Sequence, residues 1–182
     1  MGERDGGRVV VSTTISLDGY STGPDEDMGF VFNADMGPSP LVDRLIARTG
    51  AFLSGRGSYE YGRRHNKEAF DGTWSGAQFI LTHKPPEPPD PAVTFLSGDI
   101  RAAVATARAA AGPKDVNVAG ANVVQQCVAA GLVDELVLLV VPVLLGGGIR
   151  LFERFDGGET ALELLECAAP NGVVNLHYRV RG

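Results

Sequence analysis

The chain has 182 residues, of which 44% are hydrophobic and 21% are charged, a composition typical of a folded globular protein rather than a disordered one. Its formal net charge of −6 argues against a nucleic-acid-binding surface, which needs clustered Lys and Arg, but is compatible with a local basic pocket for a phosphate. The longest apolar run, residues 136–145, is shorter than the ~18 residues of a transmembrane helix, and the charged, glycine-rich start is not a signal peptide. We therefore expect a cytoplasmic protein that does not contact a membrane.

The length fits a single domain, which we expect to span residues 1–182, with a flexible N-terminus at 1–8. The two cysteines, Cys127 and Cys167, lie far apart within apolar patterns and are predicted to be buried free thiols rather than a disulfide. The three histidines are isolated, and no Cys-x-x-Cys or His-x-Glu spacing occurs in the sequence. The sequence therefore predicts no metal site.

Strand and helix patterns alternate through the first half of the chain. The predicted elements are a buried strand at 9–15, a long loop, a helix at 41–48, a short strand at 51–54, a helix at 58–63 and an irregular stretch at 65–76. Pro38-Ser39-Pro40 is a typical helix start, and Gly50 ends the helix that follows it.

The second half continues this alternation and then changes to strands alone. The predicted elements are a strand at 78–82, an exposed proline-rich loop at 84–91, a strand at 93–96, a helix at 100–111, a strand at 116–119, a helix at 122–130, a strand at 136–143 and two strands at 159–168 and 173–180. Asn171-Gly172 between the last two strands is the strongest short signal for a hairpin. Together these elements predict a mixed α/β sheet.

Three turns in this pattern have the residues of a phosphate site. Ala119-Gly120-Ala121 joins a strand to a helix without bulky side chains, so backbone N–H groups and the helix N-terminus can approach a diphosphate. Gly55-Arg56 also follows a strand, and Arg56 presents a planar fork of donors, while Ser58 can cap the next helix or bond a phosphate oxygen. A third turn, Thr82-His83-Lys84, offers a hydroxyl and two basic side chains. The alternative for each turn is a solvated turn or an ordinary helix start that binds no ligand.

The order of four segments resembles the dihydrofolate-reductase-like family, and within it the reductase domain of bacterial riboflavin biosynthesis and its stand-alone relatives. The segments are ISLDGY at 15–20, LSGRGSYE at 53–60, FILTHK at 79–84, and the stretch 116–152 with GLVDEL at 131–136 and PVLLG at 142–146. The resemblance covers nearly the whole chain. It implies a three-layer α/β fold, in which a mixed, mostly parallel sheet has helices on both faces and ends in a C-terminal antiparallel hairpin.

The resemblance also implies NADPH as the cofactor. The residues at the family's cofactor positions are Thr14, Gly55, Arg56, Ser58, Thr82, His83, Lys84, Ala119, Gly120, Ala121 and Asn122. His83 and Lys84 stand where an arginine is common among relatives, which leaves the choice between NADPH and NADH open. Relatives carry an unusual cis peptide in the small-residue turn, so we expect a strained, cis-compatible peptide between Ala119 and Gly120.

The substrate side is less well defined. By family position Asp18 lies in the loop over the nicotinamide and is expected to bind substrate, although an Asp-Gly carboxylate commonly bonds its own backbone instead. Asp43 lies in the helix where relatives carry a carboxylate, at a shorter spacing to Gly55, and Asp35 lies just upstream. Asp18 and Asp43 are therefore the predicted substrate-binding residues, and no catalytic residue is assigned.

The resemblance implies an NADPH-dependent reductase that transfers a hydride to an imine or carbonyl carbon of a pterin- or pyrimidine-like small molecule. The alternative is a dimeric nucleotide-binding scaffold of the same fold without turnover. The missing acid favours the scaffold, whereas Gly55-Arg56 and Gly120 favour the enzyme. Residues 136–143 show almost no polar alternation, so both faces of that strand must be covered, and with the terminal hairpin they predict a symmetric homodimer.

Overall fold

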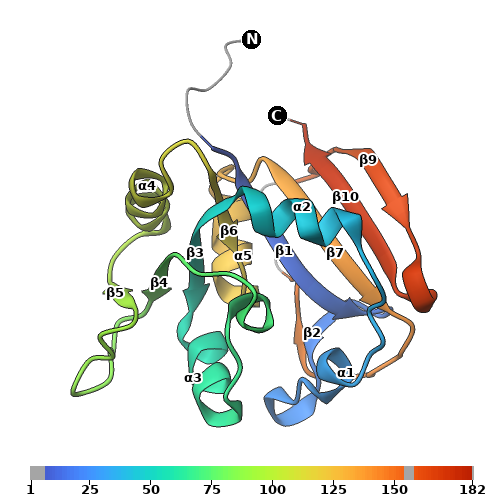
Figure 1. Ribbon diagram of the computed structural model, residues 1–182, viewed down its shortest axis with the longest axis horizontal. Coiled ribbons are helices and arrows are strands. Elements are labelled where there is room, and N and C mark those ends of the chain that lie inside the picture. The colour runs from blue at the N-terminus through green and yellow to red at the C-terminus, as the bar shows by residue number, and fades with distance from the viewer. Residues whose placement is uncertain (1–6, 154–157, 182) are drawn as a thin grey trace.

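An eight-stranded sheet forms the centre of the molecule in the computed structural model, which describes residues 7–153 and 158–181 (Figure 1). Its strands are β1 (Val9–Ser16), β3 (Thr49–Gly55), β4 (Ala77–Leu81), β5 (Thr94–Leu96), β6 (Asp115–Val118), β7 (Glu135–Val141), β9 (Leu162–Ala168) and β10 (Val174–Val180). Their spatial order is β5-β4-β3-β6-β1-β7-β10-β9. The first six strands of this order are parallel, and β10 is antiparallel to both of its neighbours, β7 and β9. The predicted mixed, mostly parallel sheet is confirmed.

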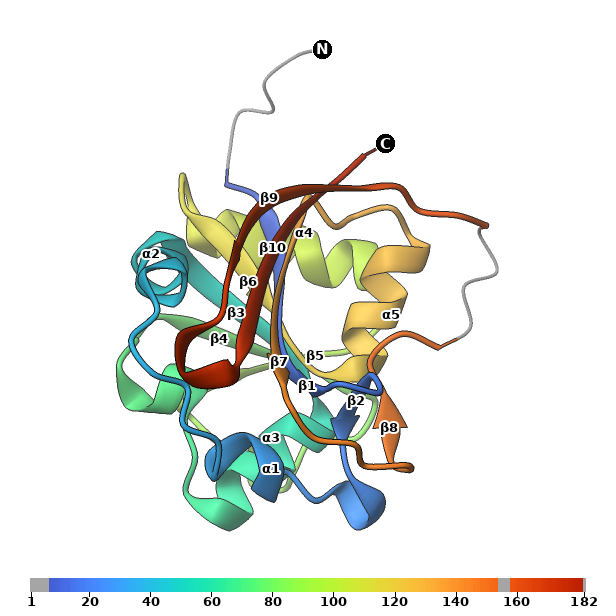
Figure 2. The ribbon, with the colours of Figure 1, turned by 90° about the vertical axis from the view of Figure 1, so that its right-hand side faces the viewer.

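Helices cover both faces of the sheet, which gives the three predicted layers. The helices are α1 (Gly29–Phe32), α2 (Pro40–Arg48), α3 (Arg56–His65), α4 (Ile100–Ala111) and α5 (Ala121–Ala129). Seen along the sheet, α2 lies on one face and α4 and α5 lie on the other (Figure 2). Within the described residues, no helix is both long and apolar enough to cross a membrane.

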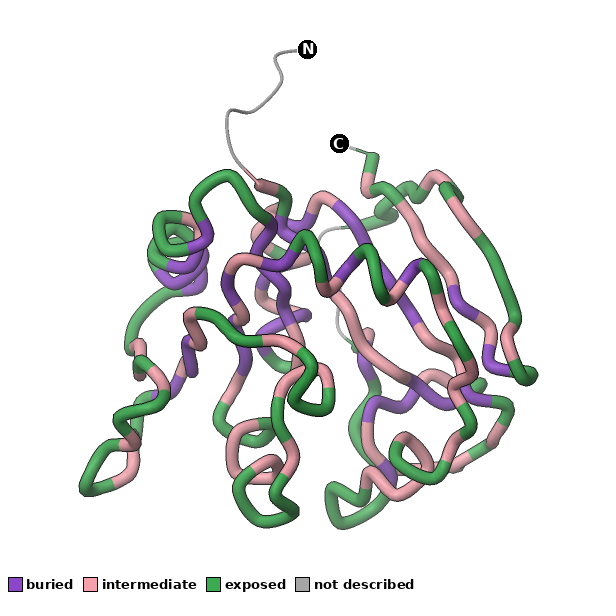
Figure 3. Tube along the Cα trace, in the orientation of Figure 1, coloured by how far each residue is buried: buried purple, intermediate pink, exposed green. Residues whose placement is uncertain are grey.

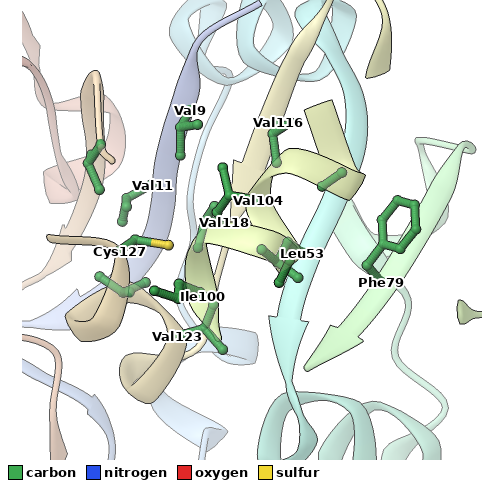
Figure 4. Close-up of a cluster of buried hydrophobic side chains, with 14 of the residues drawn as sticks. Val9, Val11, Leu53, Phe79, Ile100, Val104, Val116, Val118, Val123 and Cys127 are labelled. Atoms are coloured by element: carbon green, nitrogen blue, oxygen red, sulfur yellow. The ribbon is translucent and has the colours of Figure 1, made fainter. Parts of the chain in front are cut away.

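The main core lies between the sheet and the helices α4 and α5. Side chains of the central strands, including Val11, Leu53 and Val118, pack there against Val104 and Val123 (Figure 4). Each of these five is at most 2% exposed. Burial is concentrated in the central strands, while the connecting loops and turns are largely exposed (Figure 3). Rigid strands therefore end in accessible turns, an arrangement that positions residues for binding.

The C-terminal hairpin forms at the predicted Asn-Gly signal. Both Asn171 and Gly172 have positive φ, 48° and 82°, within the short 3₁₀ turn Pro170–Gly172. Such values suit Asn and Gly far better than other residues. β10 pairs with β7 on one side and with β9 on the other, so β9 forms an edge of the sheet.

Several local predictions need correction. The long loop after β1 contains a short strand, β2 (Tyr20–Thr22), a 3₁₀ turn (Pro24–Glu26) and α1, and β2 pairs with the equally unpredicted β8 (Ile149–Arg150). Periodicity cannot reveal elements of two to four residues. Cys127 is buried, and burial raises the pKa of its thiol to about 12, but Cys167 is exposed on the edge strand. Most of the N-terminus predicted to be flexible lies outside the described residues.

Candidate functional site

A cavity of about 860 Å³ opens where β1, β3, β4 and β6 end and the turns after β3, β4 and β6 meet, at the lower edge of the sheet in Figure 1. Open parallel sheets bind ligands at this edge, because the loops that leave neighbouring strands diverge there. Nine of the predicted cofactor residues line the cavity: Gly55, Arg56, Ser58, Thr82, His83, Ala119, Gly120, Ala121 and Asn122. The structure therefore brings together three turns that are up to 67 residues apart in sequence, counting from Gly55 to Asn122.

The other two predicted cofactor residues lie elsewhere. Thr14 is absent from the lining, whereas its neighbour Thr13 is part of it. Lys84 lines a second pocket, and its backbone N–H donates to the hydroxyl of Thr82 at 3.1 Å, which fixes the turn after β4.

The turn at Gly120 requires a glycine, but its peptide is not cis. Gly120 has φ 86° and ψ 122°, a conformation that residues with a side chain rarely adopt. A Cβ at this position would lie 2.7 Å from the hydroxyl oxygen of Ser58. Within the described chain the cis peptide is Glu87–Pro88, so the peptide between Ala119 and Gly120, expected to be strained and open to a cis form, is trans and has the unusual φ at Gly120 instead. Gly120 lines the cavity with a positive φ and a trans peptide.

Two helix N-termini begin at this cavity without a side-chain cap. The N-cap residues of α3 and α5 are Gly55 and Gly120, and the described structure shows no side-chain hydrogen bond at either cap. In contrast, Ser39 caps α2 and Asp99 caps α4, each by accepting a backbone N–H. Of the two alternatives for Ser58, capping the helix is wrong, because α3 begins at Arg56 with Gly55 as its N-cap, and a bond to a phosphate stays a prediction. The free N–H groups of two helices can therefore bind an anionic ligand.

A second pocket of about 620 Å³ adjoins the first and is rich in cationic side chains. Four of them line it: Arg56, Arg63, Arg64 and Lys84. Glu60 is the acidic member of the lining, and it pairs with Arg56. Tyr59, Phe95, Pro85 and Pro86 supply an apolar surface beside these charges. This combination suits a ring that carries a phosphate.

Tyr59 ties the proline-rich loop to α3 between the two pockets. Its hydroxyl donates to a carboxylate oxygen of Asp90 at 3.0 Å and accepts from Arg63 at 3.3 Å. The backbone N–H of Ala92 and the Tyr59 hydroxyl together lower the pKa of Asp90. The contact with Tyr59 also raises the pKa of Arg63. Both groups are therefore charged at neutral pH.

Part of the cavity lining, called the aromatic end below, consists largely of ring side chains, a feature that the sequence did not indicate. Phe32 stacks parallel on Tyr61, with ring centroids 5.8 Å apart, and the ammonium of Lys67 lies 4.4 Å from the Phe32 ring centroid. Phe70 stands edge-on to Phe52 at 5.8 Å. All five residues line the cavity. This wall can hold a flat ring, because aromatic faces favour stacked and edge-on partners.

Backbone strain accompanies this aromatic wall. Phe70 and Asp71 both have positive φ, 51° and 53°, which is unusual for residues with large side chains. Trp74, which packs against both Phe52 and Phe70, anchors the segment because its indole N–H donates to the carbonyl of Thr49 at 2.9 Å. Strain of this kind persists where packing enforces it, and it clusters at binding sites.

Neither predicted substrate-binding carboxylate lines the cavity. Asp43 is exposed on α2. Asp18 lies near the cavity, but its carboxylate accepts hydrogen bonds from Ser16, Leu145 and Gly146. These bonds, that from Ser16 foremost, lower the pKa of Asp18 to about 2, so it is ionised at neutral pH and is a poor proton donor. The substrate-binding role of Asp18 therefore stays a prediction, and its carboxylate is already bonded within the chain.

Glu68 is a carboxylate of the cavity that sequence reasoning missed. It lies in the stretch predicted to be irregular, lines the cavity, and has no side-chain hydrogen bond or ion pair in the described chain. In contrast, Glu26 pairs with Arg64 at 3.5 Å, and Asp90 is held by Tyr59. No local motif marks Glu68, so only the fold reveals it. Among the described residues, no group of three or more His, Cys, Asp or Glu side chains could hold a metal ion.

The residues present fit a phosphorylated dinucleotide such as NADPH. A glycine at Gly120 leaves open the space that a side chain would fill, and two uncapped helix N-termini face the same cavity. The adjoining pocket provides the cationic side chains that a further phosphate needs.

Comparison with known proteins gives one curated relative and several solved structures. The chain is 32% identical over 100 residues to the uncharacterized protein YwjB of Bacillus subtilis (strain 168). That stretch covers 55% of this chain and 57% of the relative, so the match spans little more than half of either protein.

The structural neighbours share the fold at low sequence identity. A protein of Shewanella sp. PV-4 assigned to riboflavin biosynthesis has a TM-score of 0.80 at 20% identity, and the match covers 96% of this chain and 99% of that one. A bifunctional pyrimidine deaminase and uracil reductase of Thermotoga maritima has a TM-score of 0.68 at 12% identity, covering 97% of this chain and 57% of that one. Dihydrofolate reductase of Enterococcus faecalis, complexed with NADP(H), has a TM-score of 0.60 at 14% identity, covering 96% and 97%. These likenesses confirm the dihydrofolate-reductase-like fold.

The family itself is established by sequence. Residues 8–174 match the family model described as the RibD C-terminal domain, which is nearly the whole chain. This match includes the three turns at the cavity and the strands that position them. The chain belongs to the RibD C-terminal domain family, as its motifs predicted.

Proposed function

We propose that this protein is an NADPH-dependent reductase that delivers a hydride to an imine or carbonyl carbon of a small pterin- or pyrimidine-like molecule. The observation that carries the proposal is the pair of uncapped helix N-termini at Gly55 and Gly120, which face one cavity beside a pocket of four cationic side chains. A diphosphate with a further phosphate satisfies both features. Relatives named as reductases, one of them complexed with NADP(H), support the same assignment.

In this proposal, different residues along the cavity bind different parts of the cofactor. The turns at Gly55 and Gly120 bind the diphosphate through backbone N–H groups, and Arg56 adds a charge-assisted bond. Arg63 and Lys84 hold the further phosphate, while Tyr59 and Phe95 provide the apolar surface beside it. When bound, the cofactor supplies the hydride, and the chain's part is to align donor and acceptor and to exclude water.

The aromatic end receives the substrate in this proposal. Phe32, Phe52 and Phe70 provide ring surfaces, and Gln78 on the neighbouring strand offers an amide that can both donate and accept hydrogen bonds. Glu68 is the carboxylate free to accept from N–H groups of the substrate. The proton that completes the reduction comes from solvent or from a group of the substrate complex.

A nucleotide-binding scaffold without turnover is the second candidate. The specific observation in its favour is Asp18, whose carboxylate is occupied by the protein's own N–H and O–H groups. NADPH oxidation assayed with pterin and aminopyrimidine substrates separates the two. Turnover supports the reductase, whereas tight NADPH binding without oxidation for any such substrate supports the scaffold.

Calorimetric titration of Arg56→Ala with NADPH tests the cofactor site. Loss of a bidentate, charge-assisted contact should weaken binding by about 1.5–3 kcal/mol. Arg179→Ala is the matched control, because Arg179 is equally exposed, also pairs with a glutamate and lies on the far hairpin. Equal affinities for the wild type and Arg56→Ala contradict the proposed site, and a comparable loss in Arg179→Ala means that the effect is not local.

A further inference from the structure

We propose that Asp18 is a positioning residue, a carboxylate clamp that joins two loops and so holds one wall of the nicotinamide end of the cavity. The inference rests on the proposed function for the identity of the ligand. It assigns Asp18 a role different from the substrate contact expected from the sequence, since Asp18 acts through the loops that it joins. The two loops are residues 17–19, after β1, and residues 142–148, after β7.

Both oxygens of the Asp18 carboxylate accept hydrogen bonds from the protein. The hydroxyl of Ser16 donates to Oδ1 at 2.6 Å. The backbone N–H of Leu145 donates to both oxygens, at 3.1 and 3.2 Å, and that of Gly146 donates to Oδ2 at 2.8 Å. Two of the three donors belong to a loop 127 and 128 residues away in sequence. The carboxylate therefore serves as the anion that organises the glycine-rich turn at 146–148.

Further bonds join the loop after β1 to the loop after β7 and to the adjacent β8 and Leu151. Leu17 donates its N–H to the carbonyl of Val143 at 2.9 Å, and Leu151 donates to that of Gly19 at 3.0 Å. Arg150 donates to the backbone carbonyl of Asp18 at 3.1 Å, and its guanidinium lies 4.5 Å from the ring centroid of Tyr20. The junction is thus continuous from the end of β1 through β2 and β8.

The clamped loops lead directly into β2 and β8, which carry residues that line the cavity, although Asp18 itself does not. β2 begins two residues after Asp18 and β8 begins three residues after Gly146. The hydroxyl of Ser21 donates to the carbonyl of Ile149 at 3.0 Å, which links the two strands. Ser21, Thr22 and Ile149 line the same cavity as Thr13 and Gly120. If the two loops separated, this wall would move away from the turn at Gly120.

The clamp depends on the carboxylate and not only on the size of the side chain. An amide in its place would turn an NH₂ group toward backbone N–H donors, so Asn would lose acceptors and add a donor–donor contact. The pKa of about 2 keeps the group ionised, so the clamp is present throughout the neutral range. A titrating catalytic acid would instead impose its own pH dependence on ligand binding near neutrality.

Two ligands and a matched variant test the clamp. In the proposed binding mode NADPH spans the whole cavity, whereas adenosine 2′,5′-bisphosphate has no nicotinamide and would leave that end of the cavity empty. Asp18→Asn should weaken NADPH binding about three- to tenfold by calorimetry and leave the affinity for adenosine 2′,5′-bisphosphate unchanged. Amide hydrogen exchange at Leu145 and Gly146 should accelerate, and the loss of NADPH affinity should be the same at pH 6 and pH 8. Asp25→Asn is the control, because Asp25 is an exposed aspartate in the 3₁₀ turn after β2 and does not line the cavity.

The outcomes separate the clamp from the proposed function. A wild type that binds neither compound overturns the cofactor assignment and the clamp's role in binding with it. If the wild type binds both compounds and Asp18→Asn binds NADPH equally well, only the clamp is overturned. An equal loss of affinity for both ligands in the variant also overturns the clamp alone. If Asp18→Asn does not fold, Arg150→Gln weakens the same junction from the other side and should show the same ligand pattern. Unchanged NADPH affinity in Arg150→Gln then counts against the clamp.

Discussion

Charged side chains are buried and paired at the amino ends of the parallel strands, and they are exposed at the carboxyl ends. At the amino ends of β6 and β7, Asp115 and Glu135 are buried and paired with arginine side chains. Arg48 lies 2.7 Å from Asp115, and His177 lies 2.9 Å from Glu135, which also pairs with Arg8. At the carboxyl ends, the four cationic side chains of the second pocket, Arg56, Arg63, Arg64 and Lys84, are exposed around open cavities.

This difference separates structural charge from charge available to a ligand. A buried carboxylate must be paired, because desolvation makes an isolated charge costly. The exposed arginines of the second pocket also have partners, since Arg56 pairs with Glu60 and Arg64 with Glu26, but such surface pairs contribute little to stability and can be exchanged for an anionic ligand. The caps follow the same division, since α2 and α4 are capped by side chains and α3 and α5, which begin at the cavity, are not.

Removing Glu135 should produce the largest loss of stability. Its side chain is 2% exposed, pairs with Arg8 and Arg48 and hydrogen-bonds to His177, so Glu135→Ala should lower the free energy of unfolding by about 3 kcal/mol. The half-exposed Arg8 and Arg48 can turn to water, which limits the cost. Urea denaturation measures the change, and Glu60→Ala at the other edge should alter it by less than about 1 kcal/mol. Similar losses of stability in both variants contradict the distinction between structural charges at the amino ends of the strands and ligand-binding charges at their carboxyl ends.

The sequence predicted the fold well, because its signals are local. Parallel strands buried on both faces, such as β1 and β7, appear as apolar runs, and Asn171-Gly172 marks the hairpin. The two-residue strand β8 and the four-residue helix α1 were missed, because their formation depends on partners far away in the chain. The N-terminus shows the same limitation. Arg8 was expected to be flexible, but its backbone N–H donates to Asp115 at 2.8 Å.

The site was predicted only in part, and the division has a physical reason. Turns that bind through backbone N–H groups need small residues at fixed places, so Gly55 and Gly120 are visible in the sequence. The aromatic end has no such requirement, and Phe32, Tyr61 and Phe70 meet only through the tertiary structure. Asp18 was predicted in part. The Asp-Gly pair predicts a carboxylate that bonds its own turn, whereas the donors from the distant loop appear only in the folded chain.

Two glycine variants can sharpen the claim that the turn at Gly120 is built for a ligand. Gly120 and Gly131 both have positive φ, so replacement by Ala strains either backbone by about 1–2 kcal/mol. Only at Gly120 would the new Cβ meet a neighbour, the Ser58 hydroxyl, whereas the space at Gly131 is open. Gly120→Ala should therefore abolish NADPH binding in calorimetry, and Gly131→Ala should bind NADPH as the wild type does. Wild-type affinity in Gly120→Ala contradicts the assignment.

The symmetric homodimer stays a prediction, and the edge strand β9 is where we expect it. Leu162, Leu164 and Leu165 are 43%, 54% and 37% exposed. The two glutamates of this edge strand pair within the chain, Glu163 with Arg179 and Glu166 with Arg44, so they oppose a partner strand less than unpaired charges would. Leu164→Lys should raise the dimer dissociation constant at least about tenfold in light scattering, because a buried leucine contributes roughly 1.5–3 kcal/mol. Leu144→Lys, at an exposed loop leucine, should not, and a monomeric wild type at micromolar concentration contradicts the prediction.

The smallest effect concerns the response to acid at the cavity edge. The folded-state pKa of Asp18 is about 2, below the 3.8 of an ordinary aspartate, because the Ser16 hydroxyl and the N–H of Gly146 stabilise its charge. A lowered pKa contributes stability above pH 3.8 that is lost as the pH falls toward 2. In urea denaturation, the wild type should therefore exceed Asp18→Asn by a constant amount between pH 5 and pH 8, and this difference should shrink at pH 3. A difference that stays constant down to pH 3 would show that the bonds to Leu145 and Gly146 do not depend on the charge, and the carboxylate would then hold the two loops through its shape alone.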